Sequence, residues 1–284
     1  MKVSYYPGCS LHGTAREYDE STKAICEILG VELKELDDWN CCGASSAHSS
    51  NHFLSIALPA RNLAIAEKCD CEDLVVPCAA CFQRLKTAEQ EIRDNPHITD
   101  EVAYGGKLRI SHLLDFLCTD EHLKRVQEKI KKPLSGLKTV SYYGCLTMRP
   151  PRVTGAEDFE NPQKMDKLLK VMGAENHFWS YKTDCCGGSL VLTRPDIVKK
   201  LCSKLFDMAI EAGADAIVSA CPLCQGNLDT RQSEIAKEFG KDYYLPIFYF
   251  TELMGLAFDH PHVSQWFDRH FIDPKKLLQS VGLM

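Results

Sequence analysis

The sequence repeats one arrangement of five cysteines. In each half of the chain a single cysteine follows a glycine, a Cys-Cys-Gly comes next, and a Cys-x-x-Cys closes the set. Five cysteines that recur in the same order indicate two homologous supersecondary units, which constrains the fold more than any single motif does. The first set is Cys9, Cys41, Cys42, Cys78 and Cys81, and the second is Cys145, Cys185, Cys186, Cys221 and Cys224.

The segments around these cysteines repeat as well. The matching pairs are residues 3–6 with 140–143, residues 73–81 with 215–224 and, more weakly, residues 108–117 with 245–254. We therefore predict two homologous domains, residues 1–132 and 133–284. They are expected to join in the charged stretch 129–138, which also contains proline and glycine.

Short apolar segments alternate with helical patterns in both halves, and Gly30 and Gly173 mark helix ends. The sequence predicts strands at 2–6, 31–36, 74–76, 139–143, 176–179 and 216–219, and helices at 16–29, 49–68 (with a kink at Pro59), 162–172 and 195–212. Such alternation is typical of parallel sheets. The expected fold class is α/β, with two pseudo-symmetric, Rossmann-like domains and short parallel sheets. Ligands of such sheets bind beyond the carboxyl ends of the strands, where the single cysteine and the Cys-x-x-Cys fall.

The number of cysteines bears on both compartment and chemistry. The start of the sequence has no signal-peptide pattern, and no apolar run approaches the roughly 18 residues that span a bilayer. We therefore expect a cytoplasmic protein without a transmembrane segment, in a compartment where disulfides are rare. Fifteen cysteines in that compartment favour metal binding. The net charge of −6 argues against nucleic acid as a partner.

The local sequence suits metal-bound thiolates. A Cys-x-x-Cys where a strand meets a helix directs two thiols toward one point, and the helix N-terminus stabilises negative charge there. Gly8 and Gly43 allow positive φ and a close approach of the backbone. A structural zinc site and a cubane 4Fe–4S cluster both take four ligands, whereas each set offers five. Spacing alone leaves zinc and iron open, although five thiolates favour a larger or more open cluster.

These motifs resemble the cysteine-rich CCG domain family, and the chain with its two copies resembles the B subunit of heterodisulfide reductases over nearly its full length. The resemblance implies two non-cubane 4Fe–4S clusters, one held by each set of five cysteines named above. It implies an anaerobic oxidoreductase that reduces a disulfide, CoM-S-S-CoB-like or another thiol heterodisulfide, by one-electron steps. It further implies a ferredoxin-like C subunit and a flavin-containing A subunit as partners in the same complex.

Both Cys-Cys pairs are followed by glycine, Gly43 and Gly187, and the segment 44–48 is expected to be a short polar loop. In this the chain is similar to bacterial relatives from flavin-based electron-transfer complexes. The acceptor is therefore open: it is a small disulfide or a persulfide, or the subunit only passes electrons on. The alternatives are an electron-transfer CCG subunit of a flavin-based or quinone-linked dehydrogenase complex, and a structural zinc-binding subunit.

A few residues outside the repeat are further candidates. His48 and His52 could donate protons to a leaving thiolate, or they could be a surface or capping pair. Arg194 could bind an anionic substrate group or stand at a helix end. Cys26, Cys118 and Cys202 are expected to be small buried residues, and the Cys69-x-Cys71 pair is the best candidate for additional metal or redox chemistry. The C-terminal stretch 263–284 is expected to dock on a partner subunit.

Overall fold

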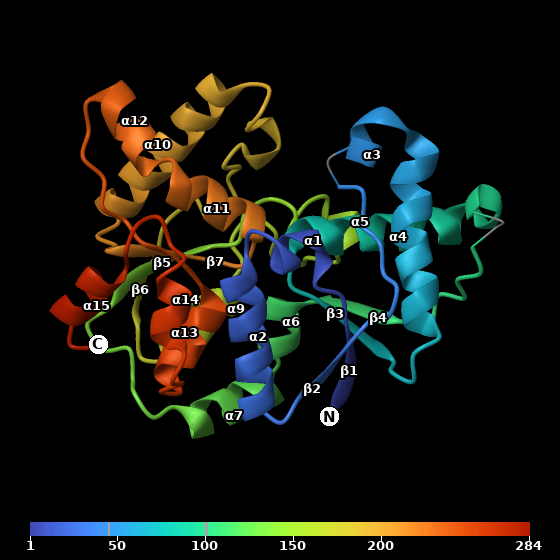
Figure 1. Ribbon diagram of the computed structural model, residues 1–284, viewed down its shortest axis with the longest axis horizontal. Coiled ribbons are helices and arrows are strands. Elements are labelled where there is room, and N and C mark those ends of the chain that lie inside the picture. Colours follow the sequence, from blue (N-terminus) through green and yellow to red (C-terminus); the bar gives the residue numbers. More distant parts are fainter. Residues whose placement is uncertain (45, 100–101) are drawn as a thin grey trace.

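Two parallel sheets, one in each half of the chain, form the centre of the computed structural model, which describes residues 1–44, 46–99 and 102–284 (Figure 1). The strand orders are β2-β1-β3-β4 and β6-β5-β7-β8, and every strand pair is parallel. The strands are β1 Lys2–Tyr5, β2 Glu32–Glu35, β3 Asp73–Val76, β4 Arg109–His112, β5 Lys138–Tyr142, β6 Glu175–His177, β7 Ala216–Ser219 and β8 Ile247–Tyr249. The predicted α/β class, with two pseudo-symmetric halves and short parallel sheets, is confirmed.

The helices of the first half follow the predicted alternation. They are α1 Gly8–His12, α2 Arg16–Ile28, α3 Ser46–Ser50, α4 His52–Glu67, α5 Ala79–Asp94, the 3-10 helix Pro96–Thr99, α6 Leu113–Leu117 and α7 Asp120–Lys129. The single helix predicted for 49–68 is in fact two, and Pro59 lies inside α4. The break falls at Asn51, whose side chain accepts a hydrogen bond from Leu54 N and so begins α4. The expected polar loop 44–48 is also wrong in part because α3 begins at Ser46; Ser45 lies outside the described residues.

The helices of the second half repeat this order with additions. They are α8 Pro151–Thr154, α9 Lys164–Val171, the 3-10 helix Gly188–Leu190, α10 Pro195–Glu211, α11 Pro222–Thr230, α12 Gln232–Phe239, α13 Phe250–Ala257, α14 Val263–Phe267 and α15 Lys275–Ser280. Gly30 and Gly173 follow α2 and α9 with φ of 71° and 86°, which confirms them as helix-ending residues. In the described part of the chain, no helix combines the length and hydropathy that crossing a membrane requires.

The sheet register corrects one detail of the repeat. Lys2 pairs with Glu32 as Lys138 pairs with Glu175, so the strands correspond with an offset that equates Tyr6 with Tyr142. The sequence match of residues 3–6 with 140–143 is therefore shifted by one residue. Both stretches read Val-Ser-Tyr-Tyr, which produced the shifted match; in the structure Pro7 takes the place of Tyr143, and the two Gly-Cys pairs align without an insertion.

The two halves share one packed interface, in which α13 and α14 lie against α2 (Figure 1). Tyr18 of α2 stacks on Tyr249 with ring centroids 4.2 Å apart and planes 4° apart. Ser21 and Thr251 share a buried hydrogen bond of 2.7 Å between their hydroxyls. One continuous apolar core therefore includes side chains of both halves.

The apolar side chains of the C-terminal stretch belong to this core. Trp266 and Phe267 are almost fully buried, and Leu278 is fully so. The expectation that residues 263–284 dock on a partner subunit is therefore wrong for these side chains, because their apolar surface is already covered by this chain. The predicted division into residues 1–132 and 133–284 stays a prediction.

A buried ion pair lies beneath the interface. Both side chains of Glu252 and His270 are shielded from solvent, and His270 Nε2 lies 2.8 Å from Glu252 Oε1. Burial alone would lower the pKa of His270, but the Glu252 carboxylate outweighs it and raises the pKa to about 9. Burial, with a further contribution from Glu252, also raises the pKa of Glu17 to about 7. Both groups therefore hold protons more tightly in the folded chain than in the unfolded one.

This pair predicts a pH-dependent stability. Since folded His270 has a pKa above its ordinary value of 6.5, its stabilisation is complete below pH 6.5 and is lost as pH rises through 9. We expect the apparent melting temperature to fall over that window in the wild type. His270→Gln should be less stable at pH 6 by about 3 kcal/mol, because Glu252 stays buried without its cation, and its curve should be flatter above pH 6.5.

The matched control for this prediction is Glu17→Gln. Raising the pKa of Glu17 from 4.5 to about 7 costs stability as pH rises between those values. In Glu17→Gln the melting temperature should no longer fall between pH 4.5 and 7, but it should still fall between pH 6.5 and 9. An unchanged slope between pH 6.5 and 9 in His270→Gln, measured by thermal denaturation, would contradict the assignment.

Candidate metal centres

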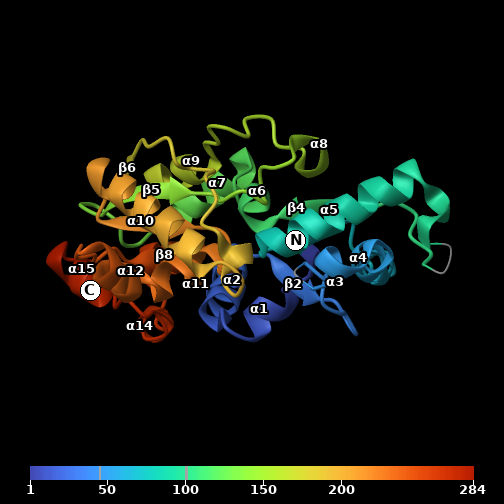
Figure 2. The same cartoon turned by 90° about the horizontal axis from the view of Figure 1, so that it is seen from above.

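The ten repeated cysteines lie in the segments that follow the carboxyl ends of β1, β2 and β3 in one sheet and of β5, β6 and β7 in the other. The helices α1, α5 and α11, which hold or directly follow five of them, lie near one another where the two halves meet (Figures 1 and 2). Cys9 lies in α1, directly after β1, and Cys78 directly precedes α5, after β3. These neighbouring strands bound the point where strand order reverses, the usual ligand position of an open α/β sheet. The Cys-Cys-Gly follows β2 on the other side of β1. The second half places its five cysteines equivalently, after β5, β6 and β7.

The first set is packed tightly. The sulfur atoms of Cys42 and Cys81 lie 3.3 Å apart. The backbone N–H of Gly43 donates to Cys41 Sγ over 3.4 Å. Gly8 has a φ of 74°, and a Cβ at this position would lie 2.6 Å from Cys81 Sγ. Only glycine leaves room for this thiol beside the turn after β1.

The second set repeats these contacts one by one. The sulfur atoms of Cys186 and Cys224 lie 3.6 Å apart, and Gly187 N–H donates to Cys185 Sγ over 3.3 Å. A Cβ on Gly144, whose φ is 69°, would lie 3.0 Å from Cys224 Sγ. Because the same contacts arise from two different sequences, the arrangement is a property of the repeat.

The neighbouring thiols polarise one another. Hydrogen bonds from Cys41 and Cys81, with help from the Arg84 guanidinium, lower the pKa of Cys42 against the effect of its burial. The pKa of Cys81 is raised correspondingly, first by its bond to Cys42. In the second half a hydrogen bond from Cys224 lowers the pKa of Cys186. The hydrogen bond with Cys42 in turn raises the pKa of Cys41. Each set thus favours thiolate at the second cysteine of its Cys-Cys pair, and thiolate is the form that binds metal.

The residues present fit a cluster held by sulfur. All donors of each set are thiols, backbone N–H groups point at two of the sulfurs, and a glycine keeps the approach open. Cys9, Cys41 and Cys185 are exposed, so each set has an open side. Over residues 1–44, 46–99 and 102–284, no group of three or more His, Cys, Asp or Glu side chains forms a ready site for a single metal ion. The assignment of all ten cysteines as ligands stays a prediction.

Two tyrosines that the sequence analysis did not single out fix the Cys-Cys segments. Tyr6 OH donates to Asn40 O over 2.8 Å, and Tyr142 OH donates to Asp184 O over 2.7 Å. Each acceptor is the carbonyl directly before a Cys-Cys pair. The signal was present in the sequence as a tyrosine two residues before each Gly-Cys, but the match of residues 3–6 with 140–143 paired Tyr6 with Tyr143 and concealed the equivalence.

The two sites lie on either side of Tyr18. Its hydroxyl is 3.2 Å from Pro77 O and 3.4 Å from Ala220 O, the carbonyls that directly precede Cys78 and Cys221. His112, fully buried, adds a hydrogen bond of 2.9 Å between its Nε2 and Pro77 O. The carboxyl ends of β3 and β7 are therefore joined through one side chain, which brings the two cysteine sets into neighbouring positions.

The predicted catalytic candidates occupy different environments. His48 Nδ1 lies 2.7 Å from Arg84 Nη1, and His48 and His52 line a hollow of about 200 Å³ beside the first set. Arg194 is exposed at the start of α10 and forms bonds of 2.9 and 2.8 Å to Asp196. This pairing favours the helix-end interpretation of Arg194 over a substrate contact.

Two of the five remaining cysteines lie in the core, and the other three are only partly buried. Cys26 and Cys202 are fully buried, which confirms their prediction as small apolar residues. Cys202 also donates from its thiol to Cys186 O over 3.4 Å, a support for the second set that its sequence position did not reveal. Cys118 is only partly buried, so its predicted burial is wrong. Its thiol donates to Lys164 O, and the thiol of Cys69 donates to Ile65 O, so both thiols have backbone partners.

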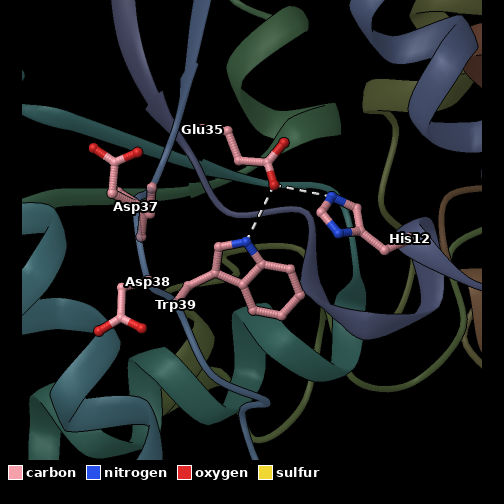
Figure 3. Close-up of a pocket in the computed structure, with 6 residues that line it drawn as sticks. His12, Glu35, Asp37, Asp38 and Trp39 are labelled. Atoms are coloured by element: carbon pink, nitrogen blue, oxygen red, sulfur yellow. Dashed lines mark hydrogen bonds and ion pairs between the residues drawn. The ribbon is translucent and has the colours of Figure 1, made fainter.

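A second hollow, of about 380 Å³, lies beside α1 (Figure 3). Glu35 holds it together, because its Oε1 lies 2.9 Å from His12 Nε2 and 3.1 Å from Trp39 Nε1. Asp37 and Asp38 complete its lining. His12 and Trp39 come from the segments that carry Cys9 and Cys41, so the contacts of Glu35 connect these two segments of the first set.

A comparison with protein families decides the relationship of the chain. The model of the CCG family, described as a cysteine-rich domain, matches residues 3–86 and 139–229. The chain belongs to the CCG family. Both matched ranges contain a complete set of five cysteines, which confirms the family recognised from the repeat.

Among its relatives, the CCG chain is 31% identical to the 8-methylmenaquinol:fumarate reductase membrane anchor subunit of Wolinella succinogenes, over 97% of this chain and 99% of that protein. It is 28% identical to the B subunit of the ferredoxin:CoB-CoM heterodisulfide reductase of Methanosarcina mazei, over 90% of this chain and 89% of that one. A crystal structure of a hypothetical protein from Helicobacter pylori shares the fold, with a TM-score of 0.74 and 15% identity. It aligns with 96% of this CCG chain, which spans 52% of that longer protein.

Proposed function

We propose that the chain is an iron–sulfur electron-transfer subunit of heterodisulfide-reductase type, with one 4Fe–4S cluster of the non-cubane kind on each set of five cysteines. The observation that carries this proposal is the position of the two sets on either side of Tyr18, at the carboxyl ends of two equivalent sheets. The similarity to B subunits of heterodisulfide reductases from several archaea supports it. The division at residue 132 assigns one cluster to each domain.

The chemistry needs two neighbouring one-electron sites. Reduction of a disulfide breaks one S–S bond and consumes two electrons and two protons to give two thiols. The bound clusters would supply the electrons one at a time. The chain's own residues hold the thiolates, and the N–H groups of Gly43 and Gly187 stabilise the charge on sulfur. The exposed cysteines leave each site open on one side for a small substrate.

The electrons are proposed to come from partner proteins. A ferredoxin-like C subunit would receive them from a flavin-containing A subunit in the same complex and pass them to this chain in the cytoplasm. The substrate is a small disulfide, either CoM-S-S-CoB-like or another thiol heterodisulfide. The absence of a G-x-G-x-x-G motif in the sequence supports placing the flavin on a partner.

A second candidate function is electron transfer in a quinone-linked complex. The relative that favours it is the reductase subunit from Wolinella succinogenes, whose name includes a menaquinol and which aligns over 97% of this chain. In that case the two clusters would form a relay between a quinol and a partner enzyme, and no disulfide would be bound.

The electron acceptor that the chain uses distinguishes the two candidate functions. Anaerobically purified chain with its clusters, supplied with reduced methyl viologen, is offered a small disulfide or a water-soluble menaquinone analogue. We expect oxidation of the viologen with the disulfide and release of two thiols per disulfide, measured with a thiol reagent. Oxidation with the quinone alone would overturn the disulfide assignment and support the quinone-linked role.

A further inference from the structure

A hollow of about 200 Å³ lies between the two halves, and its lining includes Gln83 and Arg84, which directly follow Cys81 and Phe82 on α5. It is lined by residues of α3, α4 and α5 from the first half and of α8 from the second. In the sequence α3 and α4 follow Cys42, α5 contains Cys81, and α8 follows Cys145, so the hollow is formed by segments that carry or follow ligands of both sites. Its volume is below that of pockets for drug-sized ligands, which suits one end group of a molecule.

The lining carries two arginines that pair with no carboxylate in the described part of the chain. Arg84, in the second turn of α5, is held by Gln83 Oε1 at 2.6 Å from its Nε and by His48 Nδ1 at 2.7 Å from its Nη1. Arg152, on α8, is exposed and forms no ion pair or hydrogen bond with the residues described. A planar guanidinium oriented by neutral partners keeps its remaining N–H groups available for a carboxylate or phosphate.

The charge balance of the hollow is positive. Among the described lining residues, Glu91 is the one carboxylate, and it lies two helical turns from Arg84, about 10 Å along α5. Arg84, in contrast, lies close enough to Cys42 for the two charges to interact. An anion placed in the hollow would have its other end within reach of the first cysteine set.

We propose that this hollow, between Arg84 and Arg152, binds the anionic end group of an acidic thiol or disulfide substrate. The group is a carboxylate, sulfonate or phosphate, and its recognition by two arginines from different halves would align the sulfur end with the cluster sites. This inference rests on the proposed disulfide reduction and defines its substrate class as acidic. His48 positions Arg84 through its ring nitrogen, and His52 lines the same hollow.

The test uses two disulfides that differ only in charge, dithiodipropionate and its neutral diamide. Binding to the anaerobic, oxidised chain with its clusters is measured by calorimetry, without an electron donor, so that no turnover occurs. The wild type should bind the dianion about 10- to 100-fold more tightly than the diamide, the range expected for charge-assisted hydrogen bonds to arginine. Arg152→Met and Arg84→Met should each lower the ratio of the two affinities about tenfold and leave the affinity for the diamide unchanged.

Arg93→Met is the matched control, because Arg93 lies on α5 as well, is exposed and does not line the hollow. Iron content is measured for every variant. Arg152→Met decides the result if Arg84→Met loses iron, since Arg152 forms no hydrogen bond with a cysteine among the described residues. Equal affinity of the two disulfides in the wild type, or an unchanged preference in Arg152→Met, would overturn the proposal. Reduction of both disulfides with equal KM would overturn the anion site but leave the proposed function standing. Arginine-dependent binding without reduction would support the anion site and overturn disulfide reduction.

Discussion

Replacing Cys81 with alanine will remove about half of the iron from the anaerobically purified chain, and Cys224→Ala will remove the other half. Each sulfur lies at the centre of its own set, within 3.3 Å of Cys42 Sγ and 3.6 Å of Cys186 Sγ respectively. With two 4Fe–4S clusters, iron should fall from about eight to about four atoms per chain in either variant. Disulfide-dependent oxidation of viologen should be lost in both, because each turnover needs two electron donors.

Cys26→Ala is the control for these variants. Cys26 is as buried as Cys81 but lies outside both sets, so the variant should retain all iron. The adjacent thiols Cys41 and Cys185 test whether five ligands are needed: Cys41→Ala and Cys185→Ala should each lower iron content and activity. Full cluster content with full activity in either variant would show that the fifth thiolate has no role.

A single methyl group at Gly8 should also empty the first site. In Gly8→Ala the new Cβ would lie 2.6 Å from Cys81 Sγ, at a φ of 74° that alanine tolerates poorly. We expect iron to fall toward about four atoms per chain, measured after anaerobic reconstitution, with the second cluster retained. Gly144→Ala should give a milder loss from the second site, because its Cβ would lie 3.0 Å from Cys224 Sγ.

Gly30→Ala distinguishes the effect of backbone strain at positive φ from that of a steric clash with a cysteine. Gly30 has almost the same φ, 71°, but a Cβ there meets nothing within 4 Å. This variant should lose about 1 kcal/mol of stability to the left-handed conformation and retain its iron. If Gly8→Ala and Gly30→Ala bound iron equally well, the close approach of Gly8 to Cys81 would have no bearing on cluster binding.

The sequence was sufficient for the parts of the fold that depend on local pattern. The alternation of apolar segments and helices located the strands β1, β3, β5 and β7 to within a residue or two, and the parallel sheets followed from it. The five-cysteine repeat located both sites because supersecondary units carry their ligands at fixed places relative to strand ends. The helix break at Asn51 was missed because a side-chain cap overrides a continuous helical pattern.

The contacts between the halves could not be predicted, because they join residues far apart in the chain. Tyr18 and Ala220 are 202 positions apart, yet one hydroxyl connects α2 to the end of β7. Stacking of Tyr18 on Tyr249 and the burial of Trp266 depend on how two complete units pack. Arg84 and Arg152 come together for the same reason, and neither is part of the repeated motif.

The most direct test of the two proposed clusters is the iron, sulfide and zinc content of the chain purified without oxygen. An electron paramagnetic resonance spectrum of the oxidised form is recorded on the same sample. Two 4Fe–4S clusters would give about eight irons and eight sulfides per chain with negligible zinc. Four irons with one zinc would mean that only one half carries redox chemistry. About two zincs and no iron would contradict the proposed electron-transfer function, because zinc in a four-coordinate structural site is redox-inactive.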